Sequence, residues 1–83
     1  LIKMASILVK IFNENYTLKT DANEDLVLSI AHEVDERMHK LSEQAMVTDR
    51  AKLAVWTALD LAAELRELKA SHEKLVKAIE EDF

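Results

Sequence analysis

Three residue types are missing from this sequence: glycine, proline and cysteine. Without glycine, the backbone cannot form the phosphate-cradling loop of nucleotide-binding proteins, because its turns and close backbone approach need a residue without Cβ. Without cysteine, there is no disulfide and no thiolate metal site to stabilise a chain of only 83 residues. A hydrophobic core formed by one chain of that size gives only marginal stability, so the composition favours association between copies.

Cations and long apolar runs are also scarce. Lysine and arginine number 11 against 16 aspartates and glutamates, a net charge of −5 that argues against a nucleic-acid partner. No stretch reaches the roughly 18 apolar residues of a membrane span, and the opening residues lack the length and cleavage pattern of a signal peptide. Because the absence of cysteine fits a reducing compartment, we expect a cytoplasmic protein without membrane insertion.

No arrangement typical of catalysis is present. None of the serines lies in a strand–turn–helix elbow. His32, Glu36 and His39 share one predicted helix face and include the Glu-x-x-His spacing of carboxylate-bridged iron sites, but such a site needs a second motif and two further glutamates. We therefore favour a solvated helix face over a metal site, and we expect no catalytic residue, no cofactor and no enzymatic activity.

Residues 48–83 predict one long helix. They are dominated by alanine, leucine, glutamate and lysine, which lose least on entering a helix, with Thr48 as the expected N-cap and Asp49 in the first turn. Such a helix would be about 50 Å long, whereas a compact globule of this chain's size would measure roughly 30 Å. The helix must therefore project from its own domain as a stalk.

The predicted helix presents two successive surfaces. Over residues 53–65 it is apolar almost all round, with Thr57, Asp60 and Glu64 as a narrow polar stripe, so we expect burial on most sides. Farther along, the apolar residues form one seam whose steps alternate between four and three residues, as in a coiled coil. We call this set the stalk seam and interpret it as an oligomerisation surface: Leu61, Leu65, Leu68, His72, Leu75 and Ile79.

The part of the chain before the stalk predicts a small α/β head. Residues 6–12 and 16–20 alternate as two strands, joined by Asn13, Glu14 and Asn15, which favours a hairpin. An amphipathic helix follows, capped by Asp21 or Asn23, and residues 44–47 link it to the stalk. The expected class is α+β in the order β-β-α-α, as a single domain over residues 1–83 with a head at about 6–47 and the long helix at about 48–83.

The chain resembles the ZapA family of bacterial cell-division proteins. The resemblance rests on the order and spacing of four segments: Lys10-Ile11-Phe12, Tyr16-Thr17-Leu18, Val34-Asp35-Glu36-Arg37-Met38, and the run from Lys52 to Leu65. Two positions depart from the family pattern, because Asn13 replaces the usual glycine of the hairpin and Asp60 replaces an asparagine. The resemblance implies a head that dimerises, a coiled-coil tail, and dimers that join into tetramers.

The resemblance also implies a partner and a place in the cell. The partner is the tubulin-like GTPase FtsZ, whose protofilaments such a protein would cross-link at the division site to promote assembly of the ring. Four basic residues are our candidates for binding this acidic filament: Arg37, Lys40, Arg50 and Lys52. For any one of them a solvated face with local ion pairs is an open alternative, and a coiled-coil adaptor with an unrelated target is the alternative for the whole chain.

Overall fold

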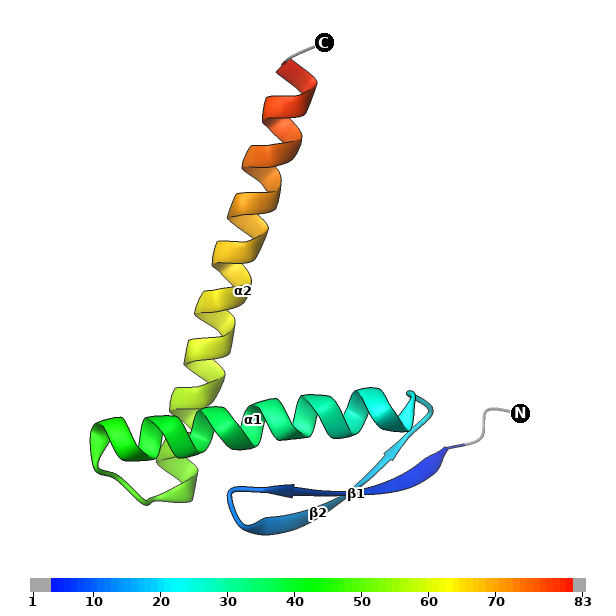
Figure 1. Cartoon of the computed structure of the whole chain (residues 1–83), viewed down its shortest axis with the longest axis vertical. Helices are drawn as coiled ribbons and strands as arrows, with labels where there is room; N and C mark the ends of the chain where they lie inside the picture. The colour runs from blue at the N-terminus through cyan, green and yellow to red at the C-terminus, as the bar shows by residue number, and fades with distance from the viewer. Residues whose placement is uncertain (1–3, 82–83) are drawn as a thin grey trace.

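The computed structural model describes residues 4–81, so Asp82 and Phe83 of the predicted long helix lie outside the described residues. Its elements are β1 (Ala5–Ile11), β2 (Glu14–Thr20), α1 (Glu24–Ala45) and α2 (Arg50–Glu81). Figure 1 shows α1 lying along the hairpin and α2 rising from near the C-terminal end of α1. The β-β-α-α order confirms the predicted α+β class, a hairpin-and-helix head followed by one long helix.

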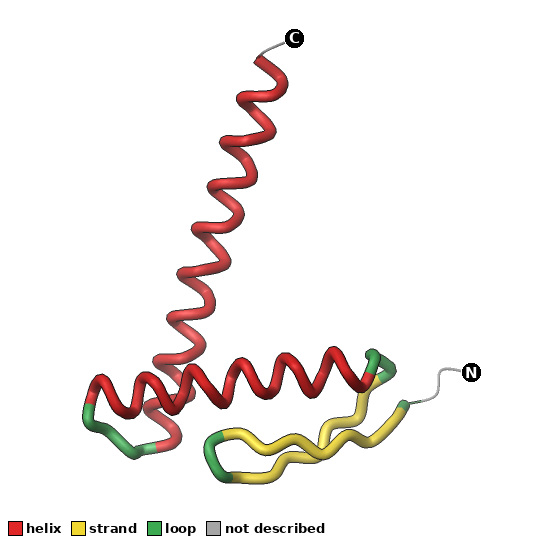
Figure 2. The backbone as a smooth tube through the Cα atoms, in the orientation of Figure 1, coloured by secondary structure: helices red, strands yellow, loops and turns green. Residues whose placement is uncertain are grey.

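The molecule is a flat L whose long arm is the stalk. Its principal extents are 51 × 46 × 16 Å, and its radius of gyration is 17.2 Å, against about 12 Å for a compact chain of this length. In Figure 2 the hairpin and α1 form the short arm, and most of α2 extends beyond them. The prediction that the long helix projects from its own domain is confirmed. Among the residues described, no helix is long and apolar enough to traverse a bilayer.

The hairpin is tighter than the sequence suggested. Ile11 pairs with Glu14, so the turn consists of Phe12 and Asn13 alone, and both have positive φ, 47° and 65°. The predicted three-residue link was wrong, because Asn15 belongs to β2 and pairs with Lys10. Two-residue turns with both residues left-handed match the twist of the flanking strands. The unexpected feature is a phenylalanine at the first of these positions, where a bulky side chain is disfavoured.

The head core lies between β1 and α1. Ile7 and Val9 alternate onto one face of the sheet, where they are buried with Ala31 of α1. Their cross-strand partners Leu18 and Tyr16 share that face but remain about two-fifths exposed. The difference arises because α1 packs along β1 and not along β2. Half of the inner face of the hairpin is therefore uncovered within one chain.

Local hydrogen bonds set the helix boundaries. Asn23, one of the two predicted caps, accepts a bond from the Leu26 N–H at 3.2 Å and starts α1. The helix ends at Met46, which is left-handed. The cap of α2 is Asp49 and not the predicted Thr48, because Asp49 Oδ1 accepts from the Lys52 N–H at 3.2 Å. The link therefore spans residues 46–49, two residues later than predicted.

The face of α2 that meets α1 consists of Leu53 and the polar stripe of Thr57, Asp60 and Glu64. Leu53 and Thr57 are fully buried where the helices cross, whereas Val55 and Leu59 are 58% and 64% exposed. The expectation of burial on most sides over residues 53–65 was therefore wrong for a single chain. The stripe can face α1 because a basic side chain of α1 meets its carboxylates. The apolar side chains on the other faces are left available for other contacts.

Candidate functional site

The four predicted basic residues occupy three separate places. Arg37 and Lys40 line a hollow of about 460 Å³ in the angle between α1 and α2, which we call the elbow. Arg50 lies at the hairpin turn. Lys52 lies two positions from Arg50, about 200° around the helix, and is exposed. The structure therefore brings only Arg37 and Lys40 onto one surface.

Arg37 is not the exposed residue that the helix pattern indicated. Its side chain is only 23% exposed, because its guanidinium donates to Asp60 at 2.9 Å and pairs with Glu64 and Glu33. The hydrogen bond from Arg37 to Glu64 is the main cause that raises the pKa of Arg37. Burial lowers that pKa by less, and Asp60 raises it further. Arg37 is thus a charged tie between α1 and α2, and the prediction of a freely exposed side chain was wrong.

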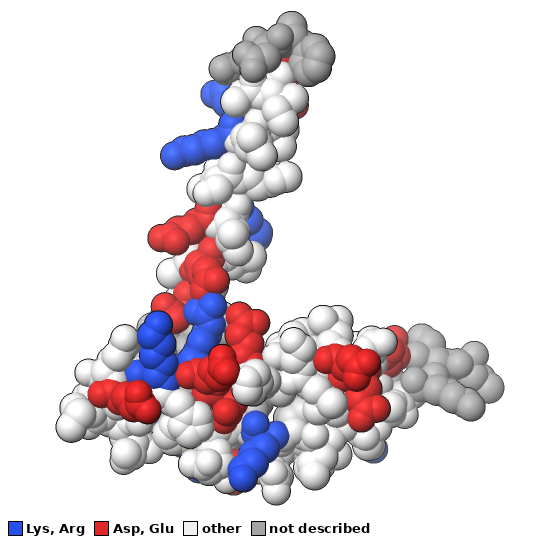
Figure 3. Space-filling view, in the orientation of Figure 1, with Lys and Arg blue, Asp and Glu red and all other residues white. Residues whose placement is uncertain are grey.

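The elbow contains two of the four predicted basic residues, but acidic side chains are more numerous there. Carboxylates of Glu33, Glu36, Asp60 and Glu64 surround Arg37 and Lys40, so acids outnumber bases there by two. Figure 3 shows red and blue side chains gathered where α1 and α2 meet. The pairs are partly solvated, and each alone contributes little to stability. Together they hold two helices at one place, which gives the elbow a structural role.

Arg50 binds the hairpin turn. Its Nη2 donates to the Phe12 carbonyl at 3.0 Å, its Nη1 lies 3.1 Å from Glu14 Oε2, and its guanidinium lies over the Phe12 ring at 5.9 Å from the centroid. From the other side, Asp35 Oδ1 of α1 accepts the Phe12 N–H at 2.8 Å. The His39 ring stacks at a tilt on Phe12, with centroids 4.9 Å apart. We call these five residues the turn junction.

The turn junction escaped the sequence analysis because its members are far apart in the chain. Arg50 and Phe12 are separated by 38 positions, and Asp35 and Phe12 by 23. The available signal was Asn13 in place of the family's glycine, which marks a left-handed turn that needs external support. The contacts that supply this support could not be located from that signal alone.

Lys40 and Lys52 are the two candidates that remain available. Both are exposed, and neither forms an ion pair with any residue in the described range 4–81. Their ammonium groups can therefore meet an acidic partner without first breaking a contact of the fold.

The histidines do not assemble a metal site. His32 Nε2 pairs with Glu36 Oε1 at 2.8 Å on an exposed face, whereas His39 is turned toward Asp35 and Phe12. Across residues 4–81, no group of three or more histidine, cysteine, aspartate or glutamate side chains is placed to hold a metal ion.

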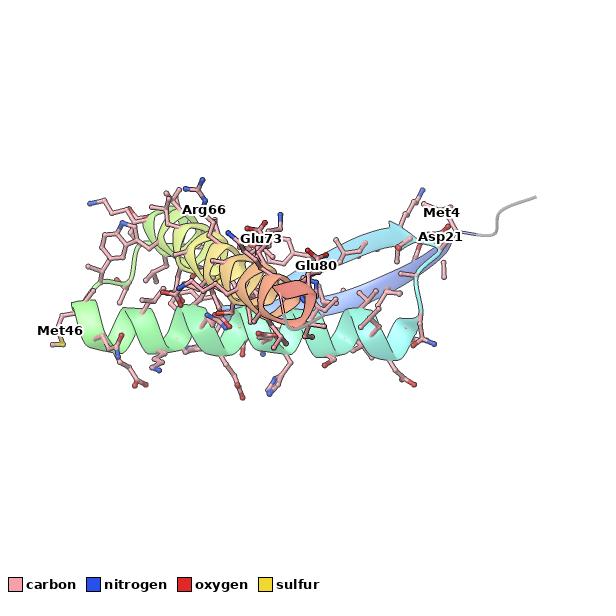
Figure 4. All side chains as sticks on the ribbon, turned by 90° about the horizontal axis from the view of Figure 1, so that it is seen from above. Met4, Asp21, Met46, Arg66, Glu73 and Glu80 are labelled. Atoms are coloured by element: carbon pink, nitrogen blue, oxygen red, sulfur yellow. The ribbon has the colours of Figure 1, made fainter. Side chains whose placement is uncertain are left out.

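The stalk seam is uncovered by its own chain. Leu65, Leu68, Leu75 and Ile79 are each more than half exposed, and every residue from 62 to 80 is exposed. Charged residues recur at seven-residue spacing along another face, as Arg66, Glu73 and Glu80. Figure 4 shows Arg66 projecting away from α1. The stalk thus carries an apolar seam beside a charged face, the pattern of a helix that packs against other helices.

A second apolar surface lies in the head. Between β2, α1 and the start of α2 there is a groove of about 290 Å³ with an almost wholly apolar lining. Its lining residues are Val9, Ile11, Tyr16, Leu18, Val34, Met38, Arg50 and Ala54. It includes the uncovered half of the inner sheet face.

Comparisons with known proteins agree with this architecture. The sequence model of a family described as "Cell division protein ZapA" matches residues 7–82. A protein of that name from Geobacillus thermodenitrificans (strain NG80-2) is 36% identical over 67 residues, which cover 81% of this chain and 74% of the relative. One from Geobacillus kaustophilus (strain HTA426) is 31% identical over 74 residues, covering 89% and 81%. A solved structure described as "ZapA mutant dimer from Geobacillus stearothermophilus" matches with a TM-score of 0.70 at 30% identity, over 93% of this chain and 90% of that one.

Proposed function

Because the chain belongs to the ZapA family of cell division proteins, we propose that it is a division accessory protein that binds FtsZ and cross-links its protofilaments. In this role it would act in the cytoplasm at the division site and promote assembly of the ring. The role requires no catalysed reaction and no cofactor. It requires at least two copies of the filament-binding surface in one particle, because cross-linking depends on simultaneous engagement.

The observation that carries the proposal is the uncovered stalk seam on a helix that leaves its own head. An apolar seam in water is unfavourable, and pairing with a second stalk would remove it from solvent. Self-association to a dimer and then to a tetramer would place several heads on one particle. The stalk contributes to this association through its seam, Leu61, Leu65, Leu68, His72, Leu75 and Ile79. A structure of a relative is described as a dimer, which supports the first of these steps.

For the filament contact, we propose the basic residues of the head and of the first turn of α2. Lys40 and Lys52 supply cations that form no ion pair with a described residue. Arg37 and Arg50 are partly exposed, but their guanidinium groups are already paired with Asp60 and Glu14. Only the exposed edge of each guanidinium can contact a partner. Since such contacts lie at the surface, added salt should weaken them.

Filament co-sedimentation tests the proposal. Purified chain, FtsZ and GTP are mixed, and bundled filaments are measured in a low-speed pellet. We expect bundling by the wild type, loss of bundling by the seam variant Leu68→Glu, and no effect of Lys74→Glu, an exposed stalk substitution off the seam. Oligomeric wild-type protein that leaves FtsZ filaments unbundled would favour an adaptor with another target. Monomeric wild-type protein at tens of micromolar would overturn the oligomeric architecture.

A further inference from the structure

The angle between head and stalk depends on a small number of contacts. The two helices cross once, at Leu53 and Thr57, which are buried in the crossing. Every residue from 62 to 80 is exposed, and beyond Glu64, which pairs with Arg37, no ion pair joins the described part of the stalk to the head. One crossing point resists separation of two helices much more than it resists rotation of one against the other. The rotation must be restrained by contacts on either side of that point.

The first restraint lies beyond the crossing, on the side of the stalk. Arg37 of α1 donates to Asp60 at 2.9 Å and pairs with Glu64 one turn farther along α2. A guanidinium is a planar fork with donors in fixed directions, so contact with two carboxylates constrains where both must lie. Arg37 thereby holds α2 over α1 at the elbow.

The second restraint lies before the crossing, at the first residue of α2. Arg50 donates to the Phe12 carbonyl at 3.0 Å and reaches Glu14 at 3.1 Å. Both partners belong to the hairpin, which α2 otherwise does not pack against. Asp35 fixes the same turn to α1 through the Phe12 N–H, so Arg50 is anchored to a part of the head that is itself held.

We propose that Arg37 and Arg50 form a two-point brace that fixes the head–stalk angle. Arg50 and Glu64 are separated by about 21 Å along the helix, with the crossing between them. A rotation of about 10° around the crossing would move these positions by about 1 to 2 Å, which takes a hydrogen bond out of range. The same rotation would move the far end of the stalk by about 7 Å. The brace is a property of one chain. Its consequence, a constant spacing between cross-linked filaments, rests on the proposed function.

The absence of cysteine makes the brace directly measurable. Cysteines introduced as Ser29→Cys on α1 and Ala70→Cys on α2, both at exposed positions, carry spin labels in an otherwise unlabelled protein. Labelled chains are diluted into unlabelled ones. Double electron–electron resonance then reports the distance between the two labels within one chain. Wild type should give one narrow distribution. Arg50→Gln should broaden it by about 4 Å for each 10° of freedom gained.

Matched variants separate the brace from a loss of charge or of folding. Lys52→Gln removes the same charge two residues away, where no described ion pair exists, and should leave the distribution narrow. Arg50→Lys keeps the charge but loses the fork, and should broaden it in part. Glu64→Gln loosens the other restraint while keeping the Arg37 cation. Helical circular dichroism confirms folding of each variant. An unchanged distance width in folded Arg50→Gln and Glu64→Gln would overturn the brace.

The spacing between filaments in bundles is a second measurement, and it distinguishes failure of the brace from failure of the proposed function. With the brace broken by Glu64→Gln, a position outside the proposed filament contact, we expect bundles formed by the same oligomer but with irregular spacing between filaments in electron micrographs. Wild-type protein that forms no bundles would refute the proposed function and leave the distance result standing. Regular spacing with folded Glu64→Gln, together with narrow distance distributions in Glu64→Gln and Arg50→Gln, would refute the brace alone.

Discussion

Truncation of Leu68 to alanine offers a quantitative test of the stalk seam. Leu68 is 62% exposed in the single chain, so about three-fifths of its surface is available to another copy. Burial of a whole leucine side chain contributes about 1.5–3 kcal/mol, and the available share is therefore about 1–2 kcal/mol per copy. A dimer loses this contribution twice, which amounts to about 2–4 kcal/mol and weakens association by about 30- to 1000-fold.

Sedimentation velocity over a dilution series measures this change. The head should stay folded, because Leu68 contacts nothing in its own head, and circular dichroism should be unaltered in concentrated samples. Lys74→Ala, on the same helix but off the seam, is the control and should leave the dissociation constant unchanged. A change of less than threefold for Leu68→Ala would show that the seam is not the main surface of association.

Four further outcomes follow from single positions. Asp35→Ala leaves the N–H of the first turn residue without its partner and should lower the free energy of unfolding by about 1–3 kcal/mol in a denaturant melt; an unchanged midpoint would contradict this. Met46 is left-handed and 88% exposed, so Met46→Gly should stabilise by up to about 1 kcal/mol, and a lower melting temperature would count against it. His72→Leu should strengthen association in sedimentation, since a polar residue on a coiled-coil seam costs stability; equal or weaker association would remove His72 from the seam. Lys40→Glu with Lys52→Glu should reduce FtsZ bundling without altering the oligomer, and undiminished bundling would move the contact elsewhere.

The order of the elements follows from local patterns that the sequence contains in full. Alternation over β1, the cap at Asn23 and the three- to four-residue spacing along α1 each depend on residues within a few positions of one another. The same holds for the stalk: its length and its seam from Leu61 to Ile79 are periodic features of one uninterrupted helix. For these reasons the α+β class and a projecting helix could be predicted without coordinates.

The hairpin turn shows where local sequence patterns are insufficient to predict the backbone conformation. Asn13, Glu14 and Asn15 are all acceptable loop residues, so composition alone allowed a link of three. The actual turn starts at Phe12, whose left-handed backbone is disfavoured locally and is held by Asp35 and Arg50 from distant parts of the chain. A long-range contact thus decided a local conformation.

The roles of the arginines were decided by tertiary structure alone. Exposure on an isolated helix says only which way a side chain points, and both Arg37 and Arg50 were expected to face solvent or a partner. Whether a guanidinium meets a carboxylate or a carbonyl depends on where α2 crosses α1 and where the hairpin turn ends. Which distant residues form ion pairs depends on where α2 crosses α1. Leu53 is buried at that crossing, so its packing sets the position of the crossing. Periodicity in the sequence determined which surfaces exist, and three-dimensional packing determined which of them the chain uses for itself.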